Sequence, residues 1–370
     1  MQFSINREPF LKELQLLQAI IDKKNTIPIL SNLLLEAEAK QGEAKLTATD
    51  LEVGMKCRCP AKVKKNGSLT VSAKKLYEIV RALPEAEIKI ERLDNNWISI
   101  ICERAQFKIV GMPKEEYPSL PDYDFSKAIK LPADLVKDMI TKTSFAVTQE
   151  DTRFALNGGL MSLKGNLLMM VATDAHRLCL FTCQLKGSVS EEEIQVIIPK
   201  KALIELKAMI EGEEEIAIGK SENHIFFQMG ERILLSRLIE GQYPNYEKVI
   251  PKDNDKSISL PTEKISAIIK RISLLSNERS KAIRLRFMPG RIEVSSNNPE
   301  LGEAQEELET DYQGKELIIG FNAQYLLDFL SVVEDKEIIC EMKDEASQGL
   351  LKPAEKHNYD YIYVVMPMRL

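Results

Sequence analysis

The sequence predicts an α+β protein built from three tandem copies of one domain, in which two helices cover one face of antiparallel strands. Three observations predict it: two sets of amphipathic helices and one strand motif each recur along the chain, at separations that agree. The chain has 370 residues, which is too long for one ordinary core and long enough for two or three domains. We place the domains at 1–126, 127–251 and 252–370.

Each domain is expected to open with an amphipathic helix. In the first of these helices Phe10, Leu14, Leu17 and Ile21 recur at helical spacing. The three segments with this pattern are REPFLKELQLLQAII (7–21), PADLVKDMITKTSFAV (132–147) and PTEKISAIIKRISLLS (261–276).

A second helix follows later in each domain. Each of these segments predicts a helix, a short acidic or Gly/Pro turn and an alternating strand. They are SAKKLYEIVRALPEAEIKI (72–90), PKKALIELKAMIEGEEEIAI (199–218) and NAQYLLDFLSVVEDKEIIC (322–340). Segments 98–110 and 224–239 alternate apolar and polar residues around a Glu-Arg turn, the pattern of an antiparallel hairpin.

A strand motif lies between the two helices. TATDLEVGMKCRCP (47–60) and VATDAHRLCLFTCQ (171–184) are offset by 124 residues, and IEVSSNNPELGEAQEEL (292–308) fills the same place with less identity. EEYPSLPDY (115–123) and EGQYPNYEKV (240–249) follow the second helices. The repeat is therefore about 125 residues long, enough for each copy to hold its own core, and three copies in a row suggest an arc or a ring.

Composition places the chain among globular proteins, with 44% hydrophobic and 29% charged residues. No apolar run approaches the ~18–20 residues that span a bilayer. The first residues show no basic stretch followed by an apolar core, so we expect no secretory signal and a cytoplasmic location. The net charge of −6 argues against a nucleic-acid partner when taken alone, but a basic surface can lie within an acidic molecule.

The six cysteines predict neither a metal site nor disulfides. Cys57 and Cys59 are separated by one residue on an expected strand, whereas zinc ligands need a wider spacing and a second pair. We expect reduced, buried thiols, with no metal and no cofactor.

Asp174 and His176 in VATDAHRL are the candidate acid and base of an enzyme. Nucleotide-binding, metalloprotease and serine-hydrolase motifs are absent from the sequence, and no nucleophile at a fixed offset completes a triad. The first repeat keeps the aspartate as Asp50 without a histidine, which favours a turn or capping role for both aspartates. We therefore expect no catalytic residue. An enzyme would lose turnover when His176 is substituted, whereas a binding protein would lose affinity.

The C-terminus YIYVVMPMRL (361–370) offers a further surface. After a terminal strand, Met366, Pro367 and Met368 would form an adaptable apolar patch of the kind that binds peptides. Methionines at a strand end are also common in cores, so sequence leaves both interpretations open.

Cationic side chains recur on the predicted helices. Lys74-Lys75 and Lys200-Lys201 open the second helices of the first two repeats. Either they lie on solvated helix faces, or they line a positive channel that meets phosphates without reading bases. Because aromatic residues for stacking are few, duplex is the better partner for such a channel. A three-domain scaffold that does not bind DNA is the remaining alternative.

Taken together, the motifs resemble the bacterial DNA polymerase III beta subunit family, the sliding clamps, over the full chain length. The motifs that carry the resemblance are NTIPILSNLLLE (25–36), TATDLEVGM (47–55), TRFALNGG (152–159), VATDAHRL (171–178), EGQYPNYEKVIP (240–251), LLSNERSKAIRL (274–285), NNPELGEAQEEL (297–308), ELIIGFNAQYLLDFL (316–330) and YVVMPMRL (363–370).

The resemblance implies a non-catalytic processivity factor. In this family two chains of three domains join head to tail into a closed ring around double-stranded DNA, independent of sequence. The implied partners are the DNA polymerase III catalytic subunit, the clamp loader and other replication and repair proteins with a clamp-binding motif; no membrane is implied.

The resemblance also assigns residues. DNA-facing positions are Lys24, Lys74, Lys75, Lys200, Lys201 and Phe154. The partner-peptide pocket comprises Arg153, Leu156, Thr173, Ala175, His176, Arg177, Leu178, Pro244, Lys248, Val249, Tyr325, Val364, Met366, Pro367 and Met368. The dimer interface comprises Phe107 and Ile109 of one chain and Leu274 and Leu275 of the other. The chain departs from the family pattern at Ala175, Lys248 and Phe154-Ala155, which predicts a wider and less aromatic groove.

Overall fold

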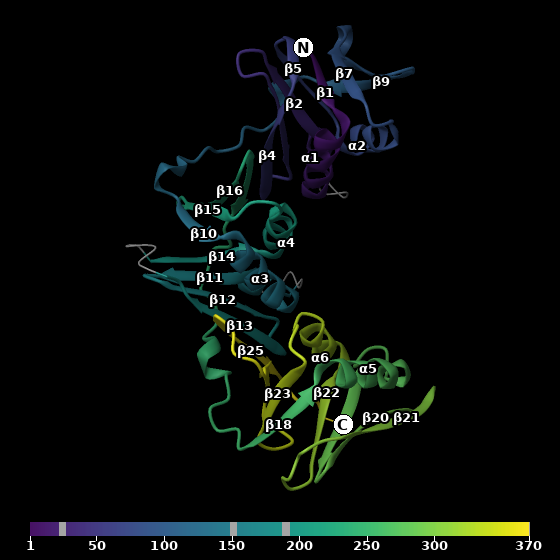
Figure 1. The fold of residues 1–370 in the computed structure, drawn as a ribbon, viewed down its shortest axis with the longest axis vertical. Helices are drawn as coiled ribbons and strands as arrows, with labels where there is room; N and C mark the ends of the chain where they lie inside the picture. The colour runs from purple at the N-terminus through teal and green to yellow at the C-terminus, as the bar shows by residue number, and fades with distance from the viewer. Residues whose placement is uncertain (22–26, 149–153, 187–192, 370) are drawn as a thin grey trace. The chain divides into compact units, whose positions relative to one another are not determined.

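The computed structural model describes residues 1–21, 27–148, 154–186 and 193–369. It consists of two compact units, one formed by residues 1–137 and 201–238 and the other by residues 138–200 and 239–370 (Figure 1). All strand pairs in the described residues are antiparallel, which confirms the predicted α+β class. None of the helices in these residues is long and apolar enough to cross a membrane.

The first unit is built on a sheet in the order β10-β15-β16-β17-β4-β3-β2-β6-β9-β8-β7-β1-β5. Its strands are β1 (Gln2–Asn6), β2 (Asn32–Glu38), β3 (Glu43–Thr49), β4 (Val53–Pro60), β5 (Lys62–Lys65), β6 (Gly67–Ser72), β7 (Glu87–Arg92), β8 (Trp97–Cys102), β9 (Ala105–Met112), β10 (Ile129–Pro132), β15 (Glu215–Lys220), β16 (His224–Met229) and β17 (Arg232–Arg237). Its helices are α1 (Arg7–Ile20), α2 (Ala73–Ala82) and most of α4 (Lys200–Met209).

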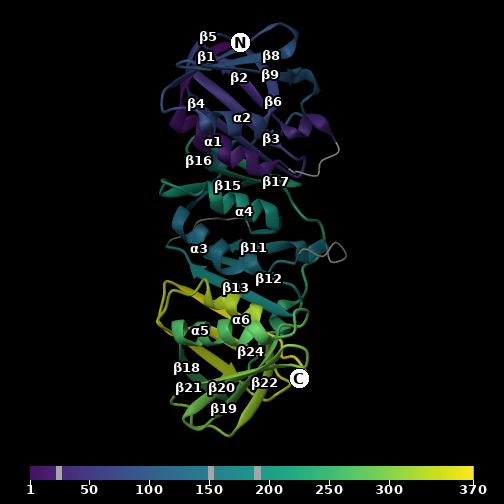
Figure 2. The same cartoon turned by 90° about the vertical axis from the view of Figure 1, so that its right-hand side faces the viewer.

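The second unit holds two sheets, in the orders β14-β11-β12-β13-β25-β24-β23-β18 and β21-β20-β19-β22. Their strands are β11 (Gly158–Lys164), β12 (Leu167–Thr173), β13 (Arg177–Gln184), β14 (Ile194–Pro199), β18 (Lys256–Pro261), β19 (Ala282–Met288), β20 (Arg291–Asn298), β21 (Gly302–Glu309), β22 (Leu317–Asn322), β23 (Glu337–Met342), β24 (Gly349–Pro353) and β25 (Tyr359–Val365). Helices α5 (Thr262–Ile272) and α6 (Ala323–Leu330) lie in front of them in Figure 2, and α3 (Ala133–Thr143) begins in one unit and ends in the other.

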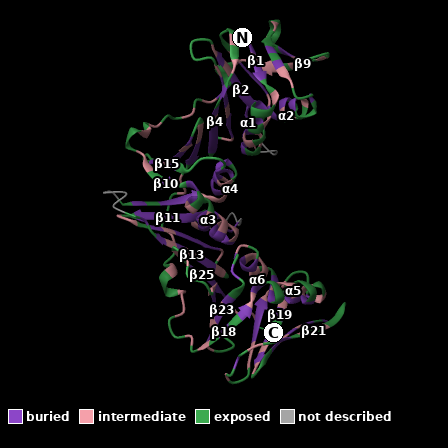
Figure 3. Ribbon diagram, in the orientation of Figure 1, coloured by how far each residue is buried: buried purple, intermediate pink, exposed green. Residues whose placement is uncertain are grey.

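The helices follow the predicted periodicity. The apolar stripe of α1 is buried at Phe10, Leu14, Leu17 and Ile20, and the inward faces of the helices are the buried ones in Figure 3. Capping fixes two of the starts: the Ser72 side chain accepts a hydrogen bond from the Lys75 amide before α2, and Asn322 accepts from two amides before α6. The six predicted helices and both predicted hairpins, β8–β9 and β16–β17, are confirmed.

The two units do not coincide with single repeats, because strands pair across repeat boundaries. In the first unit β4 of the first repeat pairs with β17 of the second. In the second unit β13 of the second repeat pairs with β25 of the third. Each pairing extends one repeat's sheet into the next, so the second repeat contributes to both units. The boundaries at 126/127 and 251/252 remain a prediction.

A buried ion pair accompanies the first of these pairings. The Glu13 carboxylate on α1 accepts hydrogen bonds from Arg232 on β17, at 2.6 Å from Nη2 and 2.9 Å from Nε, and both side chains are nearly buried. Arg232 also donates to the carbonyl of Met209. Fork-like geometry of this kind gives strong hydrogen bonds and leaves little freedom of position, so the pair fixes α1 against β17.

We expect Glu13→Ala to lower the free energy of unfolding of the first unit by about 3 kcal/mol, because Arg232 would be left buried without its partner. Thermal unfolding followed by circular dichroism measures the change. Lys12→Ala is the matched control: Lys12 lies on the same helix, but its ion pair with Glu211 is solvent-exposed and should contribute at most ~1 kcal/mol. Equal losses in the two variants would contradict the prediction.

Candidate functional site

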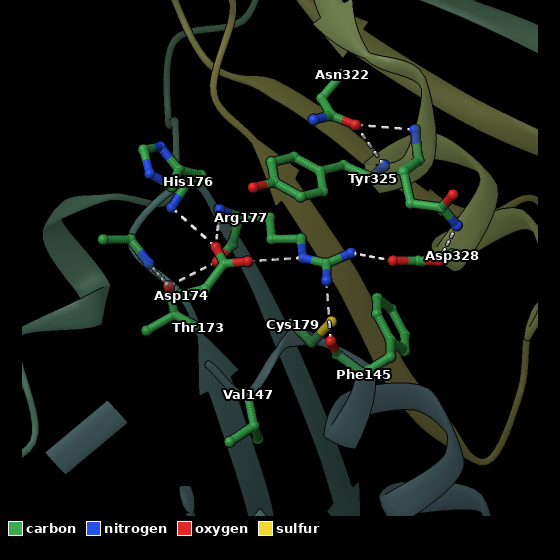
Figure 4. Close-up of polar contacts among 12 residues, drawn as sticks. Phe145, Val147, Thr173, Asp174, His176, Arg177, Cys179, Asn322, Tyr325 and Asp328 are labelled. Carbon is green, nitrogen blue, oxygen red and sulfur yellow. Dashed lines mark hydrogen bonds and ion pairs between the residues drawn. The ribbon is translucent and has the colours of Figure 1, made fainter. Parts of the chain in front are cut away.

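The VATDAHRL motif forms a tight turn between β12 and β13. Asp174 Oδ1 accepts hydrogen bonds from the amides of His176 and Arg177, both at 3.0 Å. Figure 4 shows the His176 ring directed away from the Asp174 carboxylate, and the hydrogen bond that joins these two residues comes from the histidine's backbone amide. The aspartate therefore caps a turn and does not orient an imidazole.

The first repeat contains the same turn. Asp50 Oδ1 accepts from the amides of Glu52 and Val53, at 2.9 and 2.7 Å. The residue after the aspartate has a positive φ in both copies, 79° at Leu51 and 73° at Ala175. A φ in this range is unusual for a residue with a side chain, and glycine would adopt it without strain. The turn role predicted for both aspartates is confirmed.

A cavity of about 150 Å³ opens beside this turn in the second unit. Ten of its lining residues are ones assigned to the peptide pocket from sequence: Leu156, Thr173, Ala175, His176, Arg177, Leu178, Pro244, Val249, Val364 and Met366. Asn245 and Tyr246 complete the lining and were missed. Both belong to the quoted segment EGQYPNYEKV, so the aromatic residue in that segment was the available signal.

Three segments distant in sequence build the cavity. The paired strands β13 and β25 form its floor, where Leu178 lies opposite Val364. The segment after Ile239 forms a wall, held because the Tyr243 hydroxyl donates to the carbonyl of Val171 and the Tyr246 hydroxyl contacts the Met169 sulfur. The C-terminal segment is fixed at its start, where the Met366 amide donates to the carbonyl of His176.

Arg177 connects this turn to the third repeat through hydrogen bonds. Its Nε donates to Asp174, one terminal nitrogen to Asp328 of α6 and the other to the carbonyl of Phe145 (Figure 4). The guanidinium also lies over the Tyr325 ring, 4.4 Å from its centroid. Burial alone would lower the pKa of Arg177, but Tyr363, Asp328 and Asp174 together raise it above its ordinary value. The cation is therefore permanent, and much of its hydrogen-bonding capacity is used inside the protein.

Five predicted pocket residues remain. Lys248, Tyr325, Pro367 and Met368 do not line it, and Arg153 falls outside the described residues. The Tyr325 ring instead packs against the Arg177 guanidinium. The Met368 amide donates to the carbonyl of Gly320, which fixes the chain end beside β22.

The predicted DNA-facing residues differ in their exposure and in the groups of the protein that their side chains already contact. Lys74 and Lys75 are exposed at the start of α2 and share an ion pair with Glu78. Lys200 donates to the carbonyl of Val147, and burial lowers its pKa. Lys201 is held by Asp50 and the carbonyl of Ile20. Phe154 is 72% exposed, and Lys24 lies outside the described residues.

Two of the predicted interface residues lie on a strand that is open along most of its length, and two lie in a turn beside an end strand. Phe107 and Ile109 are on β9, which pairs with β8 over residues 105–110 and meets β6 only at its last two residues. Leu274 and Leu275 follow α5 in a short 3₁₀ turn packed against β20 and β21, and Leu274 is 77% exposed. β21 is one of the two end strands of its sheet.

The cysteines are buried thiols without disulfide partners, as predicted. Burial raises the pKa of Cys59 and of Cys340 to about 12. These two thiols therefore stay protonated at neutral pH and are poor nucleophiles.

These features define a class of protein: repeated antiparallel domains joined edge to edge, with an apolar pocket at one joint. Sequence profiles of the DNA polymerase III beta subunit match almost the whole chain, the N-terminal domain at residues 1–121, the central domain at 130–245 and the C-terminal domain at 247–369. The beta sliding clamp of Pseudomonas putida is 37% identical, with both chains covered completely.

Solved structures agree with these matches. The DnaN sliding clamp of Pseudomonas aeruginosa, bound to griselimycin, superposes with a TM-score of 0.92 at 35% identity, and both chains are covered completely. The sliding clamp of Bacillus subtilis gives a TM-score of 0.93 at 30% identity, covering all of this chain and 99% of the other. The chain therefore belongs to the DNA polymerase III beta subunit family, the bacterial sliding clamps, and the family resemblance predicted from sequence is confirmed.

We expect Asp328→Ala to destabilise the second unit by about 3 kcal/mol, because Arg177 is buried and would lose one of its two carboxylates. Thermal unfolding measures the loss. Asp360→Ala, a solvent-exposed aspartate on β25, serves as control and should leave the midpoint within ~1 °C, since surface substitutions change stability little. If Asp328→Ala unfolds at the same temperature as the wild type, the bond from Arg177 to α6 does not contribute to stability, and the prediction is wrong.

Proposed function

We propose that two copies of this chain join head to tail into a ring around duplex DNA and hold replication and repair proteins by short peptides, without catalysing a reaction. Membership of the sliding clamp family supports the role in replication. The observation that carries ring closure is the presence of two open strand edges, β9 in one unit and β21 in the other, each with exposed apolar side chains beside it.

An open edge strand is a template for pairing with another chain. β9 exposes Phe107 and Val110, with the Trp97 side chain also exposed on the neighbouring strand. β21 is bordered by Leu274. If β9 of one chain pairs with β21 of another, the same contact recurs twice in a two-fold dimer, and all four edges are satisfied.

The DNA contacts are proposed to be electrostatic and weak. Lys74 and Lys75 carry exposed ammonium groups in the first turn of α2. Lys24, Lys200, Lys201 and Phe154 are the other proposed DNA-facing positions. Contacts of this kind neutralise phosphates independently of sequence and fall off steeply with salt, so they permit sliding.

The pocket is proposed to bind short apolar-aromatic peptides of the DNA polymerase III catalytic subunit, the clamp loader and other partners. Its floor is apolar at Leu178 and Val364, and Met366 can adapt to different side chains. Two relatives support a ligand site in this family: the Pseudomonas aeruginosa clamp was solved with griselimycin, and a Caulobacter crescentus clamp with polyethylene glycol at a beta-motif tethering region. Sliding clamp relatives and free cysteines support a cytoplasmic location.

A topological assay tests the ring. Protein loaded by the clamp loader onto nicked circular DNA should stay bound during gel filtration and be released when a restriction enzyme linearises the circle, because only an encircling ring slides off an end. Linear DNA blocked at both ends by bound protein is the control and should retain it. Retention on unblocked linear DNA, or no retention on the circle, would contradict encirclement.

Leu274→Lys tests the interface. Placing a charge in a proposed apolar contact should convert a dimer of twice 41.9 kDa into a monomer of 41.9 kDa, measured by light scattering. Leu167→Lys is the matched control, since Leu167 is another exposed leucine of the second unit, far from β21 in sequence and on a different sheet. An unchanged mass for Leu274→Lys would place the interface elsewhere.

A further inference from the structure

Two strand pairings join neighbouring repeats, β4 with β17 and β13 with β25, and each is called a joint here. The two joints have the same arrangement. At the β4–β17 joint Gly54 lies opposite Leu235, and at the β13–β25 joint Leu178 lies opposite Val364. The strand that arrives from the next repeat is fixed by the same bond in each: the Arg237 amide donates to the carbonyl of Glu52 at 2.8 Å, and the Met366 amide to that of His176 at 2.9 Å. The first joint is thus the structural counterpart of the joint that carries the pocket.

The segments that cross these joints also correspond. In the first unit the Tyr117 hydroxyl donates to the carbonyl of Thr47, and in the second unit Tyr243 donates to that of Val171. A proline follows each tyrosine. Figure 1 shows the segment before β10 on the side of its unit away from α1 and α2, and the segment before β18 on the side of its unit away from α5 and α6.

The joints differ in what fills the space under the crossing segment. In the second unit Tyr246 turns to Met169, and the space over Leu178 and Val364 stays open as the pocket. In the first unit the position of Leu178 is taken by Gly54, and Leu120 packs onto it.

Distances define how closely Leu120 fits. A Cβ atom built on Gly54 would lie 2.8 Å from Leu120 Cδ1 and 3.2 Å from Leu235 Cδ2, closer than carbon atoms pack. The φ of Gly54 is not positive, so the backbone does not require glycine there. Glycine at 54 instead makes room for the leucine.

The crossing segment is held on both sides of Leu120. Lys56 forms an ion pair with Asp122 and donates to the carbonyl of Pro121. Tyr123 stacks on Phe226 with ring centroids 5.0 Å apart and covers Gly219, whose missing side chain leaves it room. Tyr117, Leu120 and Tyr123 therefore anchor an extended stretch on the sheet at every third residue, as a bound peptide would be anchored.

We propose that the β4–β17 joint is a second peptide site of the same kind as the open pocket, filled in the native chain by its own residues 117–123. The ligand class is an extended peptide with a leucine three residues before an aromatic residue. The inference rests on the proposed function in that the open pocket is taken to bind peptides. One chain then presents one open site and one site closed by Leu120.

Complementation in trans tests the inference. The double variant Leu120→Ala/Tyr123→Ala removes two anchors from the chain, and the probe is the synthetic peptide YPSLPDYD, which copies residues 117–124. Calorimetric titration should show one more equivalent of peptide bound per chain than the wild type binds, and the peptide should raise the lowered melting temperature of the variant. A probe with alanine in place of its leucine should give neither effect.

The wild type tests the proposed open pocket, and the double variant tests the proposed second site. The wild type reports the open pocket alone, so absence of binding to it counts against the proposed function. A double variant that binds no more peptide than the wild type, and gains no thermal stability from it, overturns the second site.

The single variant Leu120→Ala provides a test if the double variant does not fold, since it keeps Tyr117, Lys56–Asp122 and Tyr123. A crystal of this variant pressurised with xenon should show one xenon atom between Gly54 and Leu235, because the truncation leaves an apolar space beside these two buried residues and xenon binds in apolar cavities. A collapsed joint without xenon would overturn the proposal that Leu120 fills a preformed site.

Discussion

Antiparallel pairing across the repeat boundaries is the constraint on which the rest of this structure depends. A repeat that ended its sheet at β4 or β13 would leave a strand edge unpaired, and such edges invite association with other chains. β17 and β25 satisfy these edges from within the chain. The chain must then return across the face of the extended sheet that lies away from the helices to begin the next repeat (Figure 1). The pocket lies where this returning segment and the paired strands do not meet closely.

An arginine secures each of these joints from the side. At the first joint Arg232 reaches Glu13 on a helix of the preceding repeat. At the second joint Arg177 reaches Asp328 on a helix of the following repeat. Both arginines are nearly buried, and both carry their charge on a strand that forms the joint. Fork-shaped donors suit this task because two or more bonds fix the angle between strand and helix, which hydrophobic contact alone leaves adjustable.

The residue pattern predicts those features of the fold that residues close together in the chain determine. The helices followed from periodicity, and the capping role of Asp174 followed from its echo at Asp50. The pocket residues came from the family resemblance, because the residue pattern alone left Met366–Met368 open between a core and a peptide-binding surface. The capture of Lys201 by Asp50 and the bond from Arg177 to Asp328 each join residues 151 positions apart. Such pairs depend on strand register between repeats, which periodicity within one element does not report.

The distribution of charge on the chain favours retention of DNA by a closed ring over retention by affinity. A chain with net charge −6 cannot hold DNA by overall attraction, and two of its candidate phosphate contacts, Lys200 and Lys201, already donate to groups of the protein. A protein that relied on affinity would need many free cations, and those same contacts would slow its movement along the duplex. A closed ring of the kind proposed needs neither, since its retention would come from strand pairing between subunits. The two edges proposed to pair between subunits, β9 and β21, are therefore as important to DNA retention in this proposal as any lysine.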